Sequence, residues 1–146
     1  MQLVIPIKPK AQARPRFAQI YSKRLGRHVC RAYKCNDQRQ YDDALVLWLK
    51  SYCRRHGIKP LSGPLALGVH VVLSPPRSWS KKRKEMALAG EIKPGSRPDL
   101  SNYVKTIEDC ANGILWNDDA QVVRYTDETG KYYGLPERWE IEIEEV

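Results

Sequence analysis

The sequence has no long hydrophobic run, no internal repeat and no export signal. No apolar stretch approaches the roughly 20 residues that a membrane-spanning helix needs. The N-terminus lacks the charged start and long apolar core of a secretory signal. We therefore expect a cytoplasmic protein that has no membrane partner. With 146 residues, 42% of them hydrophobic, the chain is long enough to form a single domain, residues 1–146, around one core.

A second pair of closely spaced zinc ligands is also missing. The four cysteines are Cys30, Cys35, Cys53 and Cys110, and only the first two lie near each other, with His28 beside them. Structural zinc needs four ligands, usually supplied as two such pairs. In a reducing compartment we therefore expect free thiols rather than a zinc site.

Acidic residues are scarce in residues 1–98, which carry 21 Lys and Arg against 5 Asp and Glu. Residues 99–146 reverse this balance, with 4 Lys and Arg against 12 Asp and Glu. A chain polarised in this way offers one region to a polyanion, and nucleic acid is the expected partner. An anionic membrane is the competing polyanion, but the sequence contains no Lys-rich amphipathic helix with a Leu/Trp face.

Hydrophobic periodicity predicts the secondary structure. The predicted strands are 2–8, 64–74, 121–126 and 139–144. The predicted helices are 36–56, 80–90 and 101–111, with Asn36 and Ser80 as N-caps and Gly57 as the residue that ends the first helix. Residues 9–35 form a basic arm or hairpin, and Thr129-Gly130 forms a turn. Few parallel crossovers are expected, which favours an α+β fold with a mixed sheet and helices mainly on one face.

A cluster of acidic residues lies in the sequence between Arg97 and Gln121. Asp99 precedes the third predicted helix, Lys105, Glu108 and Asp109 lie on it, and the pair Asp118-Asp119 follows it. Spacings of four, seven and eight residues bring Ser101, Lys105 and either helical acid onto neighbouring parts of one helical surface.

If the loop after this helix folds Asp119 back towards Asp99, two carboxylates and several waters can hold Mg²⁺ or Mn²⁺. Such an ion would polarise a phosphate and help to generate hydroxide. Lys105 would neutralise the charge that develops on the phosphorus oxygens. Structural roles compete with this hypothesis: Asp99 as a helix cap, Asp118 and Asp119 as turn residues, and Lys105 as the partner of Asp109.

Several segments resemble the RusA-type Holliday junction resolvases of bacteria, their phages and prophages. The N-terminal part of the resemblance is Pro9-Lys10-x₃-Arg14-Pro15-Arg16-Phe17, and Trp79 with the basic helix up to Gly90 also fits. The central part is Arg97-Pro98-Asp99-Leu100-Ser101-Asn102-x₂-Lys105, followed by Glu108-Asp109, Asn112-Gly113 and Trp116-x-Asp118-Asp119-x-Gln121-Val122.

The resemblance implies a homodimer that binds four-way DNA junctions and nicks two opposing strands symmetrically, with Mg²⁺ or Mn²⁺ as cofactor. Three family aspartates hold the metal and a lysine assists. By motif, Asp99 and Asp119 match the first and third aspartates, and Lys105 matches the lysine. A two-fold enzyme on a two-fold substrate places equal sites on equivalent strands.

One position departs from the family pattern, because Ser101 stands where the second aspartate is expected. The lost charge should weaken metal binding unless Asp118, Glu108 or Asp109 compensates, and we expect Asp118 to matter most. Two other functions remain open. One is a slow or inactive homologue that binds branched DNA without cutting it, and the other is an RNA-binding domain.

Phosphate contacts should dominate DNA binding, so that affinity falls steeply with salt. The candidate cations are Arg14, Arg16, Lys81, Lys82, Arg83, Lys84 and Arg97. The rings of Phe17, Tyr21 and Tyr33 are candidates for wedging against unstacked bases at the crossover. A place in the core or at a dimer contact is the alternative for these rings.

Overall fold

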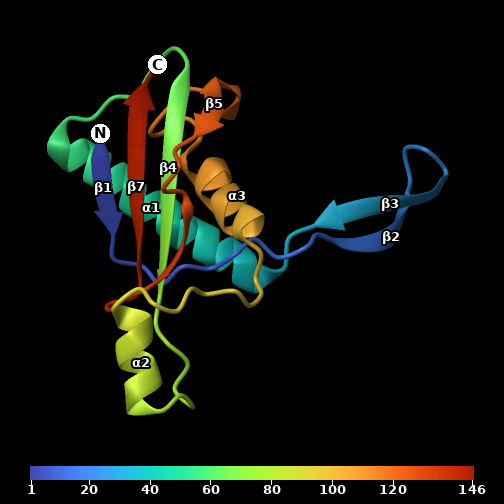
Figure 1. The fold of residues 1–146 in the computed structure, drawn as a ribbon. Helices are drawn as coiled ribbons and strands as arrows, with labels where there is room; N and C mark the ends of the chain where they lie inside the picture. The colour runs from blue at the N-terminus through green and yellow to red at the C-terminus, as the bar shows by residue number, and fades with distance from the viewer.

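The structure is a computed structural model that describes residues 1–146 (Figure 1). Its elements in chain order are β1 (Gln2–Ile5), β2 (Arg16–Ser22), β3 (Arg27–Tyr33), α1 (Asn36–His56), β4 (Leu65–Leu73), α2 (Lys81–Leu88), α3 (Leu100–Ala111), the 3₁₀ turn η1 (Asp119–Gln121), β5 (Val122–Tyr125), β6 (Gly130–Tyr133) and β7 (Arg138–Glu145). No helix among them is both long enough and apolar enough to cross a membrane.

The main sheet is mixed and is organised around β4. β7 lies between β1 and β4 and runs antiparallel to both. On the other side of β4, β5 pairs in parallel with its first half and β6 with its second half, in register from His70↔Gly130 to Leu73↔Tyr133. The predicted α+β class with a mixed sheet is confirmed. The sheet contains more parallel pairing than we expected, because both short strands follow β4 in direction.

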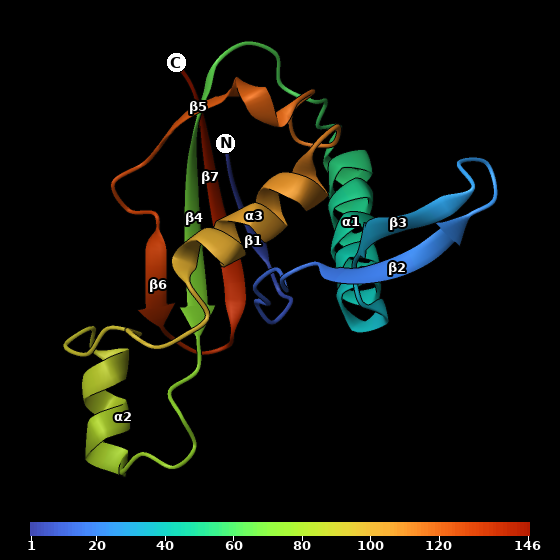
Figure 2. The same cartoon turned by 90° about the vertical axis from the view of Figure 1, so that its right-hand side faces the viewer.

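α1 and α3 cover one face of this sheet, whereas α2 lies beyond its end (Figures 1 and 2). Side chains alternate along β7, so that Trp139, Ile141 and Ile143 are buried beneath the helices. The intervening glutamates point to the opposite face, over which neither view places a helix. On α3, Val104, Ile107 and Cys110 recur every three residues on one side of the helix and are buried against the sheet. The molecule therefore has one apolar, covered face and one acidic, open face.

Several predicted boundaries and one predicted turn are wrong. Cys35, not Asn36, is the N-cap of α1, and no side chain caps this helix. β1 ends at Ile5, because Pro6 has no N–H to donate to a neighbouring strand. Gly130, predicted to end a turn, begins β6 instead. Four residues ending in two tyrosines carry a weak strand signal by themselves, and pairing with β4 supplies what the local sequence lacks.

The C-terminal end of α1 and the N-terminal end of α2 follow local chemistry more closely. Gly57 ends α1 with a left-handed φ of 64°, which glycine adopts without strain. Ser80 caps α2 by accepting a hydrogen bond from the N–H of Arg83 at 3.3 Å. The buried face of α1 is centred on Leu45, Leu49 and Cys53, and Tyr41, Trp48 and Tyr52 pack beside it.

The predicted basic arm is a two-stranded hairpin, β2–β3, that projects away from the rest of the molecule (Figures 1 and 2). The strands pair from Arg16↔Tyr33 to Ser22↔Arg27. None of its residues belongs to the hydrophobic core, and most of its side chains are exposed. Both cysteines at this end of the chain, Cys30 on β3 and Cys35 after it, are free thiols, as are the buried Cys53 and Cys110.

Candidate functional site

Asp99 occupies the N-cap position of α3, but its carboxylate makes no capping hydrogen bond. The side chain is exposed and has no hydrogen bond or ion pair with any other residue. The loop that carries it is fixed by Lys131 of β6, whose Nζ donates to the backbone oxygens of Ser96 at 2.7 Å and Pro98 at 3.1 Å. The backbone around Asp99 is thus held in place while its carboxylate stays free to bind a ligand.

The exposed side of α3 carries a lysine and an aspartate that form an ion pair. Lys105 Nζ lies 2.9 Å from Asp109 Oδ1, one helical turn away. The hydrogen bond from Lys105 to Asp109 raises the pKa of Lys105, the charges of Asp109, Glu108 and Asp119 add to this, and partial burial opposes it. Lys105 therefore stays protonated at neutral pH. It can act as a fixed positive charge towards a phosphate but not as a general base.

Asp109 is the most heavily bonded of these acids. Gln12 Nε2 donates to its Oδ2 at 2.6 Å, and Lys34 Nζ lies 3.7 Å from the same oxygen. Burial raises the pKa of Asp109, but the hydrogen bonds from Lys105 and Gln12 and the nearby lysine charges outweigh burial, so the pKa is lowered overall. Because its oxygens are already bonded, Asp109 is better suited to hold Lys105 in place than to bind a metal.

Glu108 points to β5, where the Tyr125 hydroxyl donates to its Oε1 at 2.6 Å. Burial, this hydrogen bond and the charge of Glu108 raise the pKa of Tyr125 to about 12. The ring stays half-exposed and neutral at physiological pH. Sequence reasoning did not single out Tyr125, because nothing in its local pattern links it to a glutamate 17 positions earlier.

Asp118 and Gln121 form the framework of η1. Asp118 Oδ1 accepts a hydrogen bond from the N–H of Ala120 at 2.8 Å, and Gln121 Oε1 accepts from the N–H of Asp118 at 2.9 Å. Gln121 Nε2 also donates to the backbone oxygen of Gly63, just before β4, at 2.8 Å. This capping box occupies one oxygen of Asp118. Asp119, by contrast, has no hydrogen bond or ion pair, and its charge acts on Lys105.

One chain does not bring Asp99 and Asp119 together. Asp99 precedes the first turn of α3 and Asp119 follows its last turn, and a helix of 12 residues is about 18 Å long. The register of β4 leads to the same conclusion. Lys131, which holds the Asp99 loop, pairs with Val71, whereas Val122 after η1 pairs with Leu65, and six residues of strand span roughly 20 Å. Figure 2 shows η1 and the start of α3 at opposite ends of the helix.

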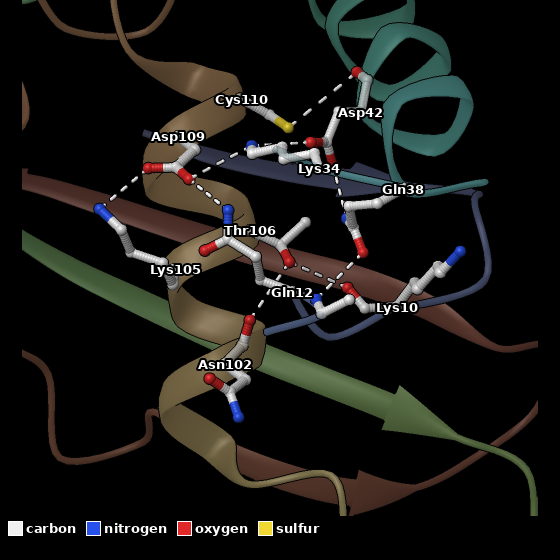
Figure 3. A network of polar contacts seen from close by, with 11 residues as sticks. Lys10, Gln12, Lys34, Gln38, Asp42, Asn102, Lys105, Thr106, Asp109 and Cys110 are labelled. Carbon is white, nitrogen blue, oxygen red and sulfur yellow. Dashed lines mark hydrogen bonds and ion pairs between the residues drawn. The ribbon is translucent and has the colours of Figure 1, made fainter. Parts of the chain in front are cut away.

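Residues 10–13, just before the hairpin, are hydrogen-bonded to α1 and to α3, as Figure 3 shows. Thr106 Oγ1 donates to the backbone oxygen of Lys10 at 3.0 Å, and Gln38 Oε1 accepts from the N–H of Ala13 at 3.2 Å. Thr106 and Gln38 are the two buried polar residues of the chain. Lys34, which follows β3, donates to Asp42 of α1 at 3.0 Å. Both ends of the hairpin are therefore anchored beside the charged side of α3.

The predicted DNA-binding cations flank α3 on two sides. Arg14 and Arg16 are exposed at the base of the hairpin, Lys81 and Lys82 are exposed on α2, and Arg97 is exposed in the loop before Asp99. Two others have partners within the chain. The Arg83 guanidinium lies 3.9 Å from the ring centre of Trp79, and Lys84 Nζ donates to the backbone oxygen of Arg77 at 3.0 Å.

The aromatic rings of the hairpin are exposed, which excludes a place in the core. Phe17 is 69% exposed, Tyr21 58% and Tyr33 41%. An isolated two-stranded hairpin with exposed apolar side chains is marginally stable by itself in water. Its rings and cations are therefore available to a bound partner.

Comparison with known proteins gives a family match over nearly the whole chain. Residues 6–144 match the family described as endodeoxyribonuclease RusA. The chain is also 36% identical, over 142 residues, to the uncharacterised protein YqaN of Bacillus subtilis (strain 168), and the match covers 95% of this chain and 92% of that protein. The family match includes the hairpin, α3 and η1.

Proposed function

Because this chain belongs to the RusA family of endodeoxyribonucleases, we propose that it is a metal-dependent nuclease that resolves four-way DNA junctions as a two-fold dimer. In this proposal residues 1–146 act as one nuclease domain in DNA recombination and repair, in the cytoplasm of a bacterium or of a phage-infected cell. The observation that carries the proposal is the contrast among the acids. Asp99 and Asp119 are unpartnered, whereas the acids beside them are bonded within the protein.

The donor set suits a hard cation. Asp99 and Asp119 offer oxygen atoms only, and Mg²⁺ or Mn²⁺ takes one or two protein carboxylates and keeps several waters. When bound, such an ion polarises the scissile phosphate and activates water for attack. Lys105, fixed by Asp109 and always protonated, stabilises the negative charge that develops on the phosphate.

Two protomers are needed to complete this site. One chain holds Asp99 and Asp119 at opposite ends of α3, so in the proposed dimer Asp99 of one protomer meets Asp119 of its partner. A two-fold contact is reciprocal, which means that one such pairing creates a second, equal site. Asp118, with one oxygen free of the capping box, comes with Asp119 to the partner's Ser101 and is placed to compensate for the missing acid there.

The cations give the dimer its affinity for DNA. The hairpin and α2 project on two sides of α3 (Figure 2), and the hairpin carries five exposed lysines and arginines and α2 three. Contacts from these residues to phosphates read the shape of the junction and not its sequence. The exposed rings of Phe17, Tyr21 and Tyr33 are placed to stack on bases at the crossover.

A cleavage assay on three substrates tests the proposal. A labelled four-way junction, a linear duplex and a folded RNA are each incubated with the protein in Mg²⁺ or in EDTA. We expect paired nicks in the junction in Mg²⁺ and none in EDTA, and a loss of at least about 100-fold in rate for Asp99→Asn. A junction band shift without nicks would support the DNA-binding homologue instead, and a preference for RNA would support the RNA-binding domain.

The serine in the family's second acid position supplies an internal test. Ser101→Asp restores a negative charge beside Asp99, so the Mg²⁺ concentration for half-maximal cleavage should fall. Ser101→Asn is the matched control, because it has nearly the size of aspartate without the charge. An equal effect of both substitutions would contradict a role for Ser101 beside the metal.

A further inference from the structure

The open face of the sheet carries a second group of metal-ligating side chains. His70 of β4, Glu142 of β7 and Glu128 of the β5–β6 loop each place one ligand atom within 4.8 Å of the others. No other group of three His, Cys, Asp or Glu side chains in the chain meets this condition. The group lines a hollow of about 860 Å³ on the face opposite to α1 and α3. It is therefore separated from Asp99 and Lys105 by the sheet itself.

The two ring nitrogens of His70 have different surroundings. Nδ1 lies 3.6 Å from Glu140 Oε2, and the other oxygen of Glu140 accepts a hydrogen bond from Arg138 at 2.7 Å. Nε2 is buried and has no hydrogen-bond partner, and Glu128 Oε2 lies 3.8 Å from it. A carboxylate behind one nitrogen and an unpartnered second nitrogen is the arrangement of a metal-binding histidine.

A second polar atom without a partner faces the same space. Thr126 Oγ1 is buried and makes no hydrogen bond. A Cβ atom added to Gly68 would lie 2.7 Å from this oxygen and 3.1 Å from Glu142 Cβ. The absence of a side chain at Gly68 therefore allows the loop after β5 and the Glu142 side chain to approach β4. Buried polar groups are normally satisfied, so two unsatisfied atoms beside one cluster indicate a missing partner.

The donor set selects the kind of ion. One imidazole nitrogen and two carboxylate oxygens suit Zn²⁺, which accepts three protein ligands and one water in a tetrahedral arrangement. Ligand atoms around tetrahedral zinc stand roughly 3.3 Å apart, given its bond lengths. Glu128 is 74% exposed and can move the required distance by changing its rotamer. Mg²⁺ rarely takes imidazole, so the ion differs from the one proposed for the nuclease site.

We propose that His70, Glu128 and Glu142 form a zinc-class metal site with three protein ligands and a water in the fourth position. The ion would link the β5–β6 loop to β4 and β7, the two strands at the centre of the sheet. β6 begins two residues after Glu128, and its Lys131 holds the loop that carries Asp99. A metal on the open face would thereby stabilise the backbone of the nuclease site without contacting DNA.

Titration calorimetry with Zn²⁺, together with thermal unfolding in Zn²⁺ or EDTA, tests this site on the full chain. We expect one equivalent to bind and to raise the unfolding temperature. His70→Gln should weaken binding at least about tenfold and remove the temperature rise. Glu128→Gln should do the same, and because Glu128 is exposed in a loop, this substitution should leave folding unchanged. No binding by the wild type, or binding by both variants as tight as that of the wild type, would overturn the proposal.

Three control variants separate this site from other zinc ligands. Glu144→Gln changes a glutamate on the same face of β7 but outside the cluster, and Cys30→Ser removes the exposed thiol. Both should bind Zn²⁺ like the wild type, and a loss of binding confined to Cys30→Ser would refute the site. Asp99→Asn should also bind Zn²⁺ normally, so failure of this proposal and failure of the nuclease proposal give different results.

Discussion

Asp109 connects three separate parts of the molecule through single side-chain contacts. It accepts a hydrogen bond from Gln12, pairs with Lys105 on its own helix and lies near Lys34 at the foot of the hairpin. The pKa of Lys34 is also shifted, by burial and by the acids around it. Burial lowers the pKa of Lys34, but its hydrogen bond to Asp42 and the charges of Asp42 and Asp109 raise it overall. Lys34, Lys105 and Asp109 are therefore all charged at neutral pH, and the two lysines stabilise the charged form of Asp109.

The lowered pKa of Asp109 has a consequence for stability. A carboxylate whose pKa is lower in the folded state stabilises the protein above its unfolded pKa, about 3.9, and loses that effect as the pH falls through the folded value. Asp109→Asn should cost about 1 kcal/mol at pH 7, since pairs near the surface contribute little more. Urea unfolding should show this difference shrinking at pH 3.

The matched control for Asp109 is Glu145→Gln. Glu145 is an exposed acid near the C-terminus without an ion pair, so its substitution should leave the urea midpoint unchanged at both pH values. If the two variants share one pH dependence, the contacts of Asp109 do not contribute to stability in solution.

At the scale of single elements, the hairpin is the part whose role can be separated from folding. Arg16 and Tyr33 face each other in the β2–β3 register. Residues 17–32 can therefore be replaced by Asn-Gly, the preferred two-residue connection between antiparallel strands. We expect the free energy of unfolding to change by less than about 0.5 kcal/mol, because no core residue is removed.

The same hairpin variant should bind four-way junctions less tightly and with a weaker salt dependence. It lacks four cations, Lys23, Arg24, Arg27 and Arg31, and each lost phosphate contact reduces the slope of log K against log salt by about 0.9. Phe17→Ser combined with Tyr21→Ser is the matched control, since it removes rings and keeps the charges. That control should lower affinity without changing the slope. A slope unaltered in the hairpin variant would exclude the hairpin from the phosphate contacts.

Elements whose signals are local could be predicted from the sequence, and elements that depend on distant partners could not. The end of α1 at Gly57, the Ser80 cap and the inward face of α3 follow from residues within a few positions of each other. β6 depends on β4, which lies about 60 positions earlier in the chain. No periodicity within Gly130–Tyr133 records that pairing.

The candidate site shows the same division. The sequence names Asp99, Lys105 and Asp119 as candidates, but it does not show where they lie in space. The loop after α3 does not fold Asp119 back, because the N–H of Leu61 donates to the backbone oxygen of Leu115 at 2.9 Å, and the N–H of Asn117 to that of Leu61 at 3.3 Å. These bonds fix the loop beside the segment before β4, beyond the end of α3. The contacts join positions more than 50 residues apart, which local patterns do not reveal.

At the scale of the whole molecule, the proposed shared site can be tested by mixing variants. Asp99→Asn and Asp119→Asn chains are co-expressed with different tags, and the mixed dimer is purified through both. If each site takes Asp99 from one protomer and Asp119 from the other, a mixed dimer contains one intact site and one doubly altered site. We expect single nicks at up to half the wild-type rate, where either variant alone is inactive.

A mixed dimer without any nicking activity would contradict the shared site. If one chain supplied both acids, both sites of the mixed dimer would be damaged and no nicks would form. A dimer of Asp99→Asn with wild-type chains is the control, because one site stays intact under either arrangement and single nicks are expected in both.

The projecting hairpin also bears on how this protein can change over time. Each of its strands has seven residues and reaches about 23 Å from the body, and the core gains nothing from their side chains. Substitutions there escape the penalty that most mutations impose on folding, so selection acts on them through the nucleic acid alone. Under the proposed function, the range of branched substrates can therefore diverge among relatives while the sheet, α3 and the proposed metal-binding acids stay the same.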